Sequence, residues 1–354
     1  MRTYCRRKEA GQEEEIVKKI RTEDAVGLSL CHDITAVKPG FKGRAFKRGH
    51  IIREEDIPAL LDLGKRTLFV WDEGAGEVHE EDAARALAEM TYLPEADYSD
   101  ISEGKITLTS KIRGLFRVDR QLLEELNSIG DITISTLADH YPVEPGSKIA
   151  GMRIVPLVTK AENLDKARAL CLGRSLFAIH PYLHLKAGAI ITGSEVYHGR
   201  IQDLFEPVIR RKLAEFPTEL LGVTFCDDDL AMLDEAAAAY LAKGADLLIF
   251  TGGMSVDPDD LTPAAIKNTG AEIITQGVPS QPGNMFTIGY LGSAALIGVP
   301  GAAIHAKTTV FDAVLPQLFT GKRFTKDDFV RLGHGGLCQQ CPVCHFPNCT
   351  FGRY

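Results

Sequence analysis

Asp246-Leu-Leu-Ile-Phe-Thr251, followed directly by Gly252-Gly-Met-Ser-Val-Asp-Pro-Asp-Asp-Leu-Thr-Pro263, carries the strongest fold signal in the chain. Its near-continuous apolar run predicts a short strand buried on both faces, as in a parallel sheet covered by helices. The two glycines permit a tight turn in which the backbone comes close to a neighbour. Pro263 then favours the first turn of a helix, where no N–H donor is needed. A strand, a glycine loop and a helix are therefore expected in this order.

The segments on both sides of this stretch alternate in the same way. Further strands are predicted at residues 187–192, 219–225, 271–275 and 294–299, and helices at residues 203–216, 228–241, 262–267 and 303–318. In the first of these helices, the apolar residues Leu204, Val208, Ile209 and Leu213 are expected to face inward. Such alternation predicts a three-layer α/β/α domain with a mostly parallel sheet, spanning residues 173–325.

Upstream of this domain the elements are shorter and more mixed. The pattern predicts a charged leader at residues 1–19, helices at 54–63, 82–90, 119–127 and 162–170, strands at 67–71, 105–116 and 131–137, and an apolar run at 154–158. We therefore expect an N-terminal mixed α/β segment at residues 1–100 and a small α+β unit at 101–172. A Cys-rich tail, residues 326–354, is expected after the α/β domain.

Composition excludes several classes of protein. The chain is 45% hydrophobic with a net charge of −8, whereas general nucleic-acid binders usually carry a basic face. No apolar run approaches the roughly 18 residues that span a bilayer, and the charged N-terminus lacks the apolar segment of a signal peptide. We expect a cytoplasmic protein that binds neither nucleic acid nor membranes.

Ligands of open parallel sheets bind outside the carboxyl ends of the strands. The loops predicted there are Thr192-Gly193-Ser194-Glu195, Cys226-Asp227-Asp228-Asp229, Thr251-Gly252-Gly253-Met254-Ser255 and Gly298-Val299-Pro300-Gly301. Glycine turns let backbone N–H groups hold a phosphate, and nearby acids indicate a divalent cation such as Mg²⁺. Taken singly, each glycine pair is also typical of a tight turn and each Asp of a helix cap. The ordered set is much more specific.

The residues of this set resemble a known family. Residues 251–263 are similar to the signature of the molybdopterin-binding domain of molybdenum cofactor biosynthesis, in which a Thr-Gly-Gly loop precedes an Asp-x-Thr helix start. Gln281-Pro-Gly-Asn284 and Gly298-Val-Pro-Gly301 resemble the paired Pro-Gly loops of the molybdenum insertion enzymes. Ile191-Thr-Gly-Ser-Glu195, with Asp203 after it, resembles their first-strand loop. The resemblance is good over residues 172–319 and weaker over residues 20–71.

The resemblance implies a ligand, a reaction and site residues. It implies a molybdopterin molybdenumtransferase that binds molybdopterin or its adenylate and exchanges AMP for molybdate with Mg²⁺. Asp227 and Asp260 match acids of the family and are expected to position metal or water. The expected ligand contacts are Thr192, Gly193, Ser194, Glu195, Asp203, Gly252, Gly253, Ser255, Pro282, Gly283, Pro300 and Gly301. His305 and Lys307 are weaker candidates, and homo-oligomers or contacts with other cofactor-biosynthesis proteins or molybdoenzymes are further expectations.

Two alternatives to the transferase stay open. Ser194 stands where the insertion enzymes usually have Asp, and their C-terminal β domain has no counterpart in the 35 residues (354 − 319) after Phe319. Both departures favour a carrier or sensor of molybdopterin or the finished cofactor that performs no chemistry. Similar domains also occur in nucleotide pyrophosphate-cleaving proteins of the competence-damage type, which is the second alternative.

The tail carries a separate signal. Cys338, Cys341, Cys344 and Cys349 have the spacing C-x₂-C-x₂-C-x₄-C. Thiolates at such spacing can converge on one tetrahedral Zn²⁺, and the run is also close to iron–sulfur spacing. A redox-sensitive, unstructured tail is the alternative. We expect a metal, with Zn²⁺ and an iron–sulfur cluster both open.

Overall fold

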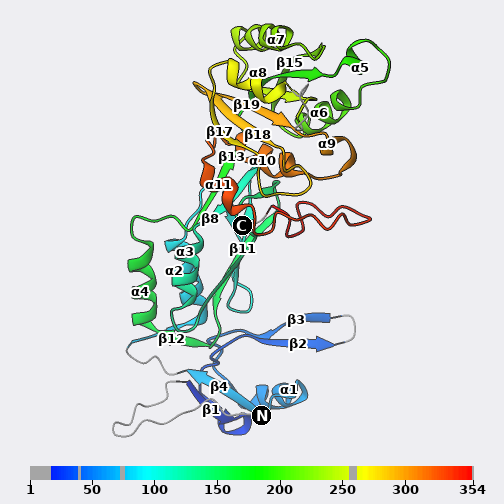
Figure 1. The fold of residues 1–354 in the computed structure, drawn as a ribbon. Coiled ribbons are helices and arrows are strands. Elements are labelled where there is room, and N and C mark those ends of the chain that lie inside the picture. Colours follow the sequence, from blue (N-terminus) through cyan, green and yellow to red (C-terminus); the bar gives the residue numbers. More distant parts are fainter. Residues whose placement is uncertain (1–16, 39–40, 72–75, 255–260, 353–354) are drawn as a thin grey trace.

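The structure, a computed structural model, describes residues 17–38, 41–71, 76–254 and 261–352. Figure 1 shows three parts in chain order, with the N-terminal strands at one end and the α/β domain at the other. In this described part of the chain, no helix has the length and apolarity needed to cross a bilayer.

The first part is a small core built on two β-ribbons. Its elements are β1 (Val17–Arg21), β2 (Ile34–Lys38), β3 (Phe41–Phe46), α1 (Ile57–Asp62) and β4 (Thr67–Trp71). β1 pairs antiparallel with β4, and β2 with β3. Leu30, Ile52 and Leu60 are buried in its core. The predicted helix at 54–63 and strand at 67–71 are confirmed.

The second part is an α+β unit with its own core. Its elements are β5 (Glu77–His79), α2 (Glu80–Met90), β6 (Ala96–Tyr98), β7 (Ile106–Ser110), β8 (Gly114–Val118), α3 (Arg120–Asn127), β9 (Ile132–Thr136), β10 (Tyr141–Val143), β11 (Lys148–Ile154), β12 (Val158–Lys160), α4 (Ala161–Cys171) and β13 (Phe177–Pro181). Asp119 caps α3 as predicted, accepting a hydrogen bond from Leu122 N. The apolar run at 154–158 is not one strand, because β11 ends at Ile154 and Val155 is exposed.

Two elements pack into the core of the second part although they lie outside the segment that the sequence predicted for it. α2 contributes Ala83, Ala84 and Leu87 to the core of the second part, and β13 contributes Phe177 and Ile179. Both elements lie outside the range 101–172 that the sequence suggested for this unit. The boundaries for independent folding stay a prediction.

The third part is the α/β domain. Its elements are β14 (Leu185–Thr192), α5 (Ser194–Tyr197), α6 (Phe205–Leu213), β15 (Thr218–Cys226), α7 (Leu230–Ala242), β16 (Leu247–Thr251), α8 (Thr262–Asn268), β17 (Glu272–Gln276), β18 (Thr287–Leu291), β19 (Ala294–Val299), α9 (Ala302–His305), α10 (Val310–Leu318) and α11 (Lys326–Arg331). One six-stranded sheet has the order β15-β14-β16-β19-β18-β17. β14, β15, β16 and β19 are parallel, whereas β18 pairs antiparallel with both β19 and β17, so the sheet is mixed.

Alternate residues of the central strands face opposite helical layers, as strand geometry requires. In β16, Leu247 and Ile249 join the cluster that includes α6 and α10. Leu248 and Phe250 join the cluster that includes α7 and α8. The continuous apolar run therefore reflects burial on both faces, which gives the three layers that the sequence predicted.

Three details of the α/β domain differ from expectation. The predicted helix at 303–318 is two helices, because Thr309 and Asp312 form a capping box that starts α10 anew. Leu204 precedes α6 and is 52% exposed, so it does not face inward. Phe329 of α11 and Leu332 directly after it are buried in the core, so these residues pack with the domain rather than with a tail.

Candidate functional site

The parallel strands β14 and β16 end side by side, and their loops form a pocket of about 420 Å³. Six of the expected contacts line it: Thr192, Gly193, Glu195, Asp203, Gly252 and Gly253. The pairing register of β14 and β16 explains why these residues meet. Ile191 is opposite Thr251, so the two strands end at the same edge of the sheet and their loops begin side by side. Loops that are far apart in the sequence are thus neighbours in one cavity.

Gly252 allows the two loops to touch. Its φ is +85°, and a Cβ atom would lie 1.9 Å from the carbonyl oxygen of Thr192. No side chain fits there, so glycine is required both for the backbone conformation and for the close approach. The glycine pair therefore does more than turn the chain, because it draws the ends of β14 and β16 together.

Thr262 closes the loop from the other side. Its hydroxyl donates to the carbonyl oxygen of Gly252 at 2.7 Å, and its side chain is fully buried. The nearby Thr251 hydroxyl is buried without a hydrogen-bond partner among the described residues. Two of the expected site residues, Ser255 and Asp260, lie outside the described residues.

Asp228, rather than Asp227, faces the pocket. Its carboxylate accepts hydrogen bonds from Thr192 Oγ1 at 2.8 Å and from Ser194 N at 2.9 Å, which ties the end of β15 to the loop after β14. Ser194 thus contributes its backbone N–H to this network. The sequence predicted a cluster of acids here but not which member points inward.

Asp227 lies beside the pocket and contacts His198 at 3.1 Å. The backbone N–H of Asp228 donates to it, and this hydrogen bond, with Ser194 and His198 nearby, lowers the pKa of the Asp227 carboxyl despite some desolvation. Asp229 caps α7 by accepting from Met232 N at 3.0 Å. The three consecutive acids therefore have three different positions.

Asp203 lines the pocket, but its carboxylate already accepts hydrogen bonds from the backbone. Its two carboxylate oxygens accept from the N–H groups of Phe205 and Glu206, at 3.0 and 2.7 Å, and so satisfy the start of α6. The exposed residues Ile201 and Leu204 form an apolar side of the same pocket. The residue pattern placed Leu204 in the core and so did not indicate this apolar side. The position of an apolar residue just before a helix start was the available signal.

None of the four expected contacts from the Pro-Gly loops, Pro282, Gly283, Pro300 and Gly301, is among the residues that line this pocket. Pro300 and Gly301 accept the first hydrogen bonds of α9, from Ala303 N and Ile304 N. Ile304 of α9 lines the pocket at Gly252, whereas Ala302 and His305 line a second pocket together with Pro282. α9 therefore separates the two cavities. Gly283, with φ +108°, packs against Val310 at the start of α10.

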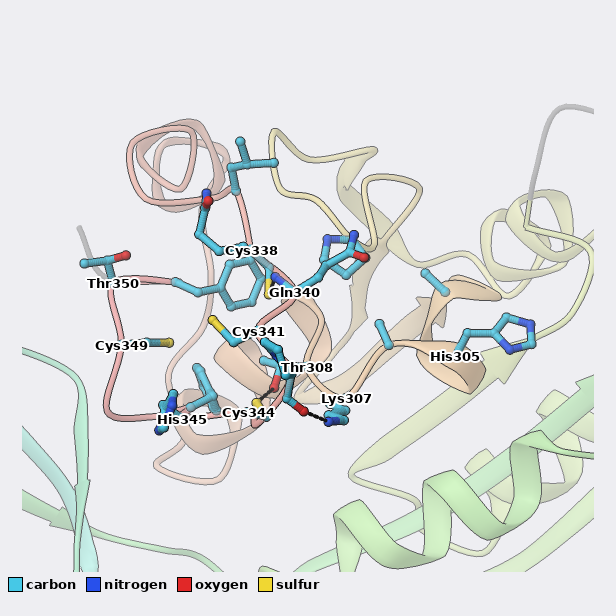
Figure 2. Close-up of a pocket in the computed structure, with 18 residues that line it drawn as sticks. His305, Lys307, Thr308, Cys338, Gln340, Cys341, Cys344, His345, Cys349 and Thr350 are labelled. Carbon is cyan, nitrogen blue, oxygen red and sulfur yellow. Dashed lines mark hydrogen bonds between the residues drawn. The ribbon is translucent and has the colours of Figure 1, made fainter.

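The second pocket, of about 540 Å³, is walled by the tail, and Figure 2 shows its lining side chains. Cys338, Cys341, Cys344 and Cys349 all line it. The Cys344 sulfur lies 3.0 Å from the Thr308 hydroxyl, and Lys307 donates to the carbonyl of Pro342 at 2.6 Å. Within the described residues, no group of three or more His, Cys, Asp or Glu side chains is arranged to hold a metal ion.

Comparison with family models identifies two regions. Residues 188–320 match a model described as a probable molybdopterin binding domain, which confirms the resemblance read from the strand-end loops. Residues 19–72 match a domain of unknown function, over the same range as the first hydrophobic core. The third part of the chain is thus a domain of the molybdenum cofactor biosynthesis type.

The curated relatives share a short segment. A CinA-like protein of Mycobacterium sp. (strain JLS) is 39% identical over 90 residues, which is 25% of this chain and 21% of the relative. One from Mycolicibacterium gilvum (strain PYR-GCK) is 42% identical over 78 residues, covering 22% of this chain and 18% of the relative. The chain therefore spans about a fifth of the length of these relatives.

Two solved structures of molybdopterin biosynthesis proteins are similar to parts of this chain. The molybdopterin biosynthesis enzyme MoaB from Thermus thermophilus is 22% identical and covers 40% of this chain and 99% of its own, with a TM-score of 0.32. The molybdopterin biosynthesis MoeA protein from Pyrococcus horikoshii is 16% identical and covers 69% of this chain and 80% of its own, with a TM-score of 0.33.

Proposed function

We propose that the chain binds molybdopterin or its adenylate in the pocket between the β14 and β16 loops, and exchanges AMP for molybdate there. The observation that carries the proposal is the contact at Gly252. Because glycine has no side chain, the backbone of this loop lies directly against the Thr192 carbonyl, at the ends of two parallel strands. Such glycine turns leave room and donors for a phosphate group. The match of residues 188–320 to the molybdopterin-binding model supports the pterin as ligand.

The charge of this pocket supports a cation beside the phosphate. Its described lining residues include the carboxylates of Glu195, Asp203 and Asp228, and no Lys or Arg. An anionic ligand among carboxylates is repelled unless a cation lies between them. Mg²⁺ fits this donor set, because it binds through one or two carboxylates together with phosphate oxygens and water.

Asp228 is the residue that we propose to hold Mg²⁺. Each of its carboxylate oxygens accepts one hydrogen bond, from Thr192 or Ser194, and keeps a lone pair for a metal. Bound Mg²⁺ would gather the charge that develops as AMP leaves. Asp227, held at low pKa beside His198, would stay ionised and orient water at the edge of the site.

The test is release of AMP from adenylylated molybdopterin by the full chain, with molybdate and Mg²⁺ under anaerobic conditions. We expect molybdate-dependent release that Asp228→Asn reduces by at least about tenfold, which is roughly 1.4 kcal/mol in the barrier. Asp229→Asn is the matched control, because that residue lies outside the pocket lining and Asn caps helices as well as Asp does.

Two other outcomes of this experiment would support a function other than molybdenum transfer. Tight pterin binding without AMP release would identify a carrier or sensor, which the engagement of Asp203 in capping α6 favours. Cleavage of a nucleotide pyrophosphate, with no pterin bound, would identify an enzyme of the competence-damage type. The CinA-like names of the curated relatives favour that second candidate.

A further inference from the structure

The tail forms a loop whose first end is hydrogen-bonded to Gln281 of the α/β domain and whose last end is hydrogen-bonded to Gly335, just before the loop. At one end, Gln281 N donates to the carbonyl of Gly336 at 2.7 Å, and Cys338 N donates to the carbonyl of Gln281 at 2.8 Å. At the other end, Gly352 N donates to the carbonyl of Gly335 at 3.0 Å. Residues 337–352 therefore leave and rejoin the domain at one place, as compact Ω-loops do.

The loop has little apolar burial of its own. Phe351 is 3% exposed, but Leu337 and Val343 are 62% and 67% exposed, and Cys341, Cys344 and Cys349 are exposed as well. Residues 337–352 contain no helix or strand in the described structure. Ordering a chain costs conformational entropy at every residue, and one buried ring offsets only a small part of that cost. Another source of stabilisation is therefore expected.

The four cysteines are the groups that can supply it. All four line the pocket that the loop forms against α9 and the link after it, residues 306–308, as Figure 2 shows. The pocket also has a fixed cation at its wall, because Lys307 is held by the carbonyl of Pro342. A nearby ammonium group offsets the negative charge that several thiolates bring together.

We propose that Cys338, Cys341, Cys344 and Cys349 hold one soft metal centre through their thiolates. In the described structure the four thiols line one pocket but are not yet arranged as a metal site. Binding therefore requires the loop to close around the metal, with each cysteine losing its proton, while its ends stay on Gln281 and Gly335. Zn²⁺ and an iron–sulfur cluster share this ligand chemistry. The centre stabilises the loop and, through Thr308 and Lys307, the break between α9 and α10.

The first experiment is metal analysis of the full chain purified anaerobically, with the visible spectrum recorded in parallel. We expect about one equivalent of zinc without colour, or iron and acid-labile sulfide with a charge-transfer absorbance; either result supports the centre and identifies it. If the protein is isolated without metal, it is incubated with ZnCl₂, or with ferrous iron and sulfide, under a thiol reductant. Failure of both additions would overturn the proposal.

Variants separate a thiolate site from adventitious metal. Cys341→Ser and Cys344→Ser should each lower the bound metal by at least about tenfold, since a ligand is lost. They should also make residues 337–352 susceptible to protease while the circular dichroism of the chain is retained. Cys171→Ala is the matched control, because Cys171 is buried in α4 and does not line this pocket.

Several results would contradict a metal site made of these four cysteines. If Cys171→Ala lost as much metal as Cys341→Ser, or if Cys341→Ser and Cys344→Ser kept full metal, the four cysteines would not be the ligands. Metal-free protein with disulfides among the four cysteines would also refute it. These readouts do not involve the pterin, so failure of the proposed transferase activity would leave them interpretable.

Discussion

Gly252 is the residue on which the geometry of the candidate site depends most directly. Its backbone lies against the Thr192 carbonyl, and no other residue type fits both the positive φ and that contact. Gly244, at φ +79° in the turn after α7, has a similar backbone conformation but no atom within 4 Å of an added Cβ. Comparing alanine substitutions at these two glycines therefore separates the cost of the positive φ from the cost of the contact.

We predict that Gly252→Ala and Gly244→Ala differ in stability. Gly244→Ala should cost about 1–2 kcal/mol, the penalty of a left-handed conformation. Gly252→Ala should cost about 1–3 kcal/mol more, because the added Cβ overlaps backbone that must move. Urea unfolding of both variants measures the difference, and pterin binding should fall for Gly252→Ala alone. Equal costs would mean that the two loops are less tightly joined than the structure shows.

The residue types of the three acids after β15 indicate where they lie but not what each one contacts. Three consecutive Asp residues after an apolar strand predicted acidic groups at this edge of the sheet. Asp227 contacts His198, Asp228 faces the pocket and Asp229 caps α7. Adjacent residues in a turn point in different directions, so their roles depended on backbone angles that the residue types do not specify.

Among the elements, α2 begins with an unusual cap. The N-cap His79 is 1% exposed, and its Nδ1 accepts a hydrogen bond from Glu81 N at 3.2 Å. Its Nε2 lies 2.6 Å from the carbonyl oxygen of Cys31, which can only accept, so Nε2 carries the hydrogen of a neutral ring. Burial lowers the pKa of His79, although the Cys31 carbonyl opposes the shift. Protonation of Nδ1 would remove the cap.

We predict that stability falls as the pH drops below the ordinary histidine value of about 6.5. The pKa of His79 is lower in the folded than in the unfolded chain, so the unfolded state binds more protons in this range and is favoured by acid. His79→Ala should cost about 1–3 kcal/mol at about pH 7. It should also lose less stability than the wild type between about pH 7 and pH 5.

The measurement is urea unfolding at both pH values. His184→Ala is the control, because His184 is exposed in the link between β13 and β14. Identical pH dependence of His79→Ala and the wild type would show that other groups, such as His32, dominate the acid response. The pKa of His32 is also lowered by burial.

The break between α9 and α10 is the feature of the helices with most bearing on the site. Residues 303–318 read as one helix because apolar residues recur along it. The capping box of Thr309 and Asp312 instead starts α10 separately, and α9 lies between the two pockets. A Thr with Asp three residues later was the signal for a new helix start, but the apolar periodicity of the segment is stronger and favours one continuous helix.

Across the molecule as a whole, the described residues bury separate hydrophobic cores. One includes residues of α2, α3 and α4, and two lie on either face of the α/β sheet. Segments far apart in the chain also meet: Tyr141 of β10, in the second part, donates a hydrogen bond to Asn348 of the tail. The core of the second part shares no residue with the two cores of the α/β domain.

We predict that heat unfolds the chain in more than one transition. Separate cores lose their packing independently when few contacts join them. Molybdopterin should raise the Tm of the transition that belongs to the α/β domain and leave the others in place, because a ligand stabilises only the unit that binds it. Scanning calorimetry with and without the pterin tests this. A single transition that shifts as a whole would show that the chain unfolds as one unit.

Residue patterns were sufficient to predict the layers of the α/β domain and the edge of the sheet at which a ligand is expected. Apolar runs such as Leu247–Thr251 can be buried only between two layers, and parallel strands place their loops at one edge. The folded chain was needed to show that Asp228 rather than Asp227 faces the pocket, that Gly252 rests on Thr192, and that the tail closes a second cavity beside α9. Those features depend on turn angles and on contacts between segments far apart in the chain, and local residue patterns contain neither.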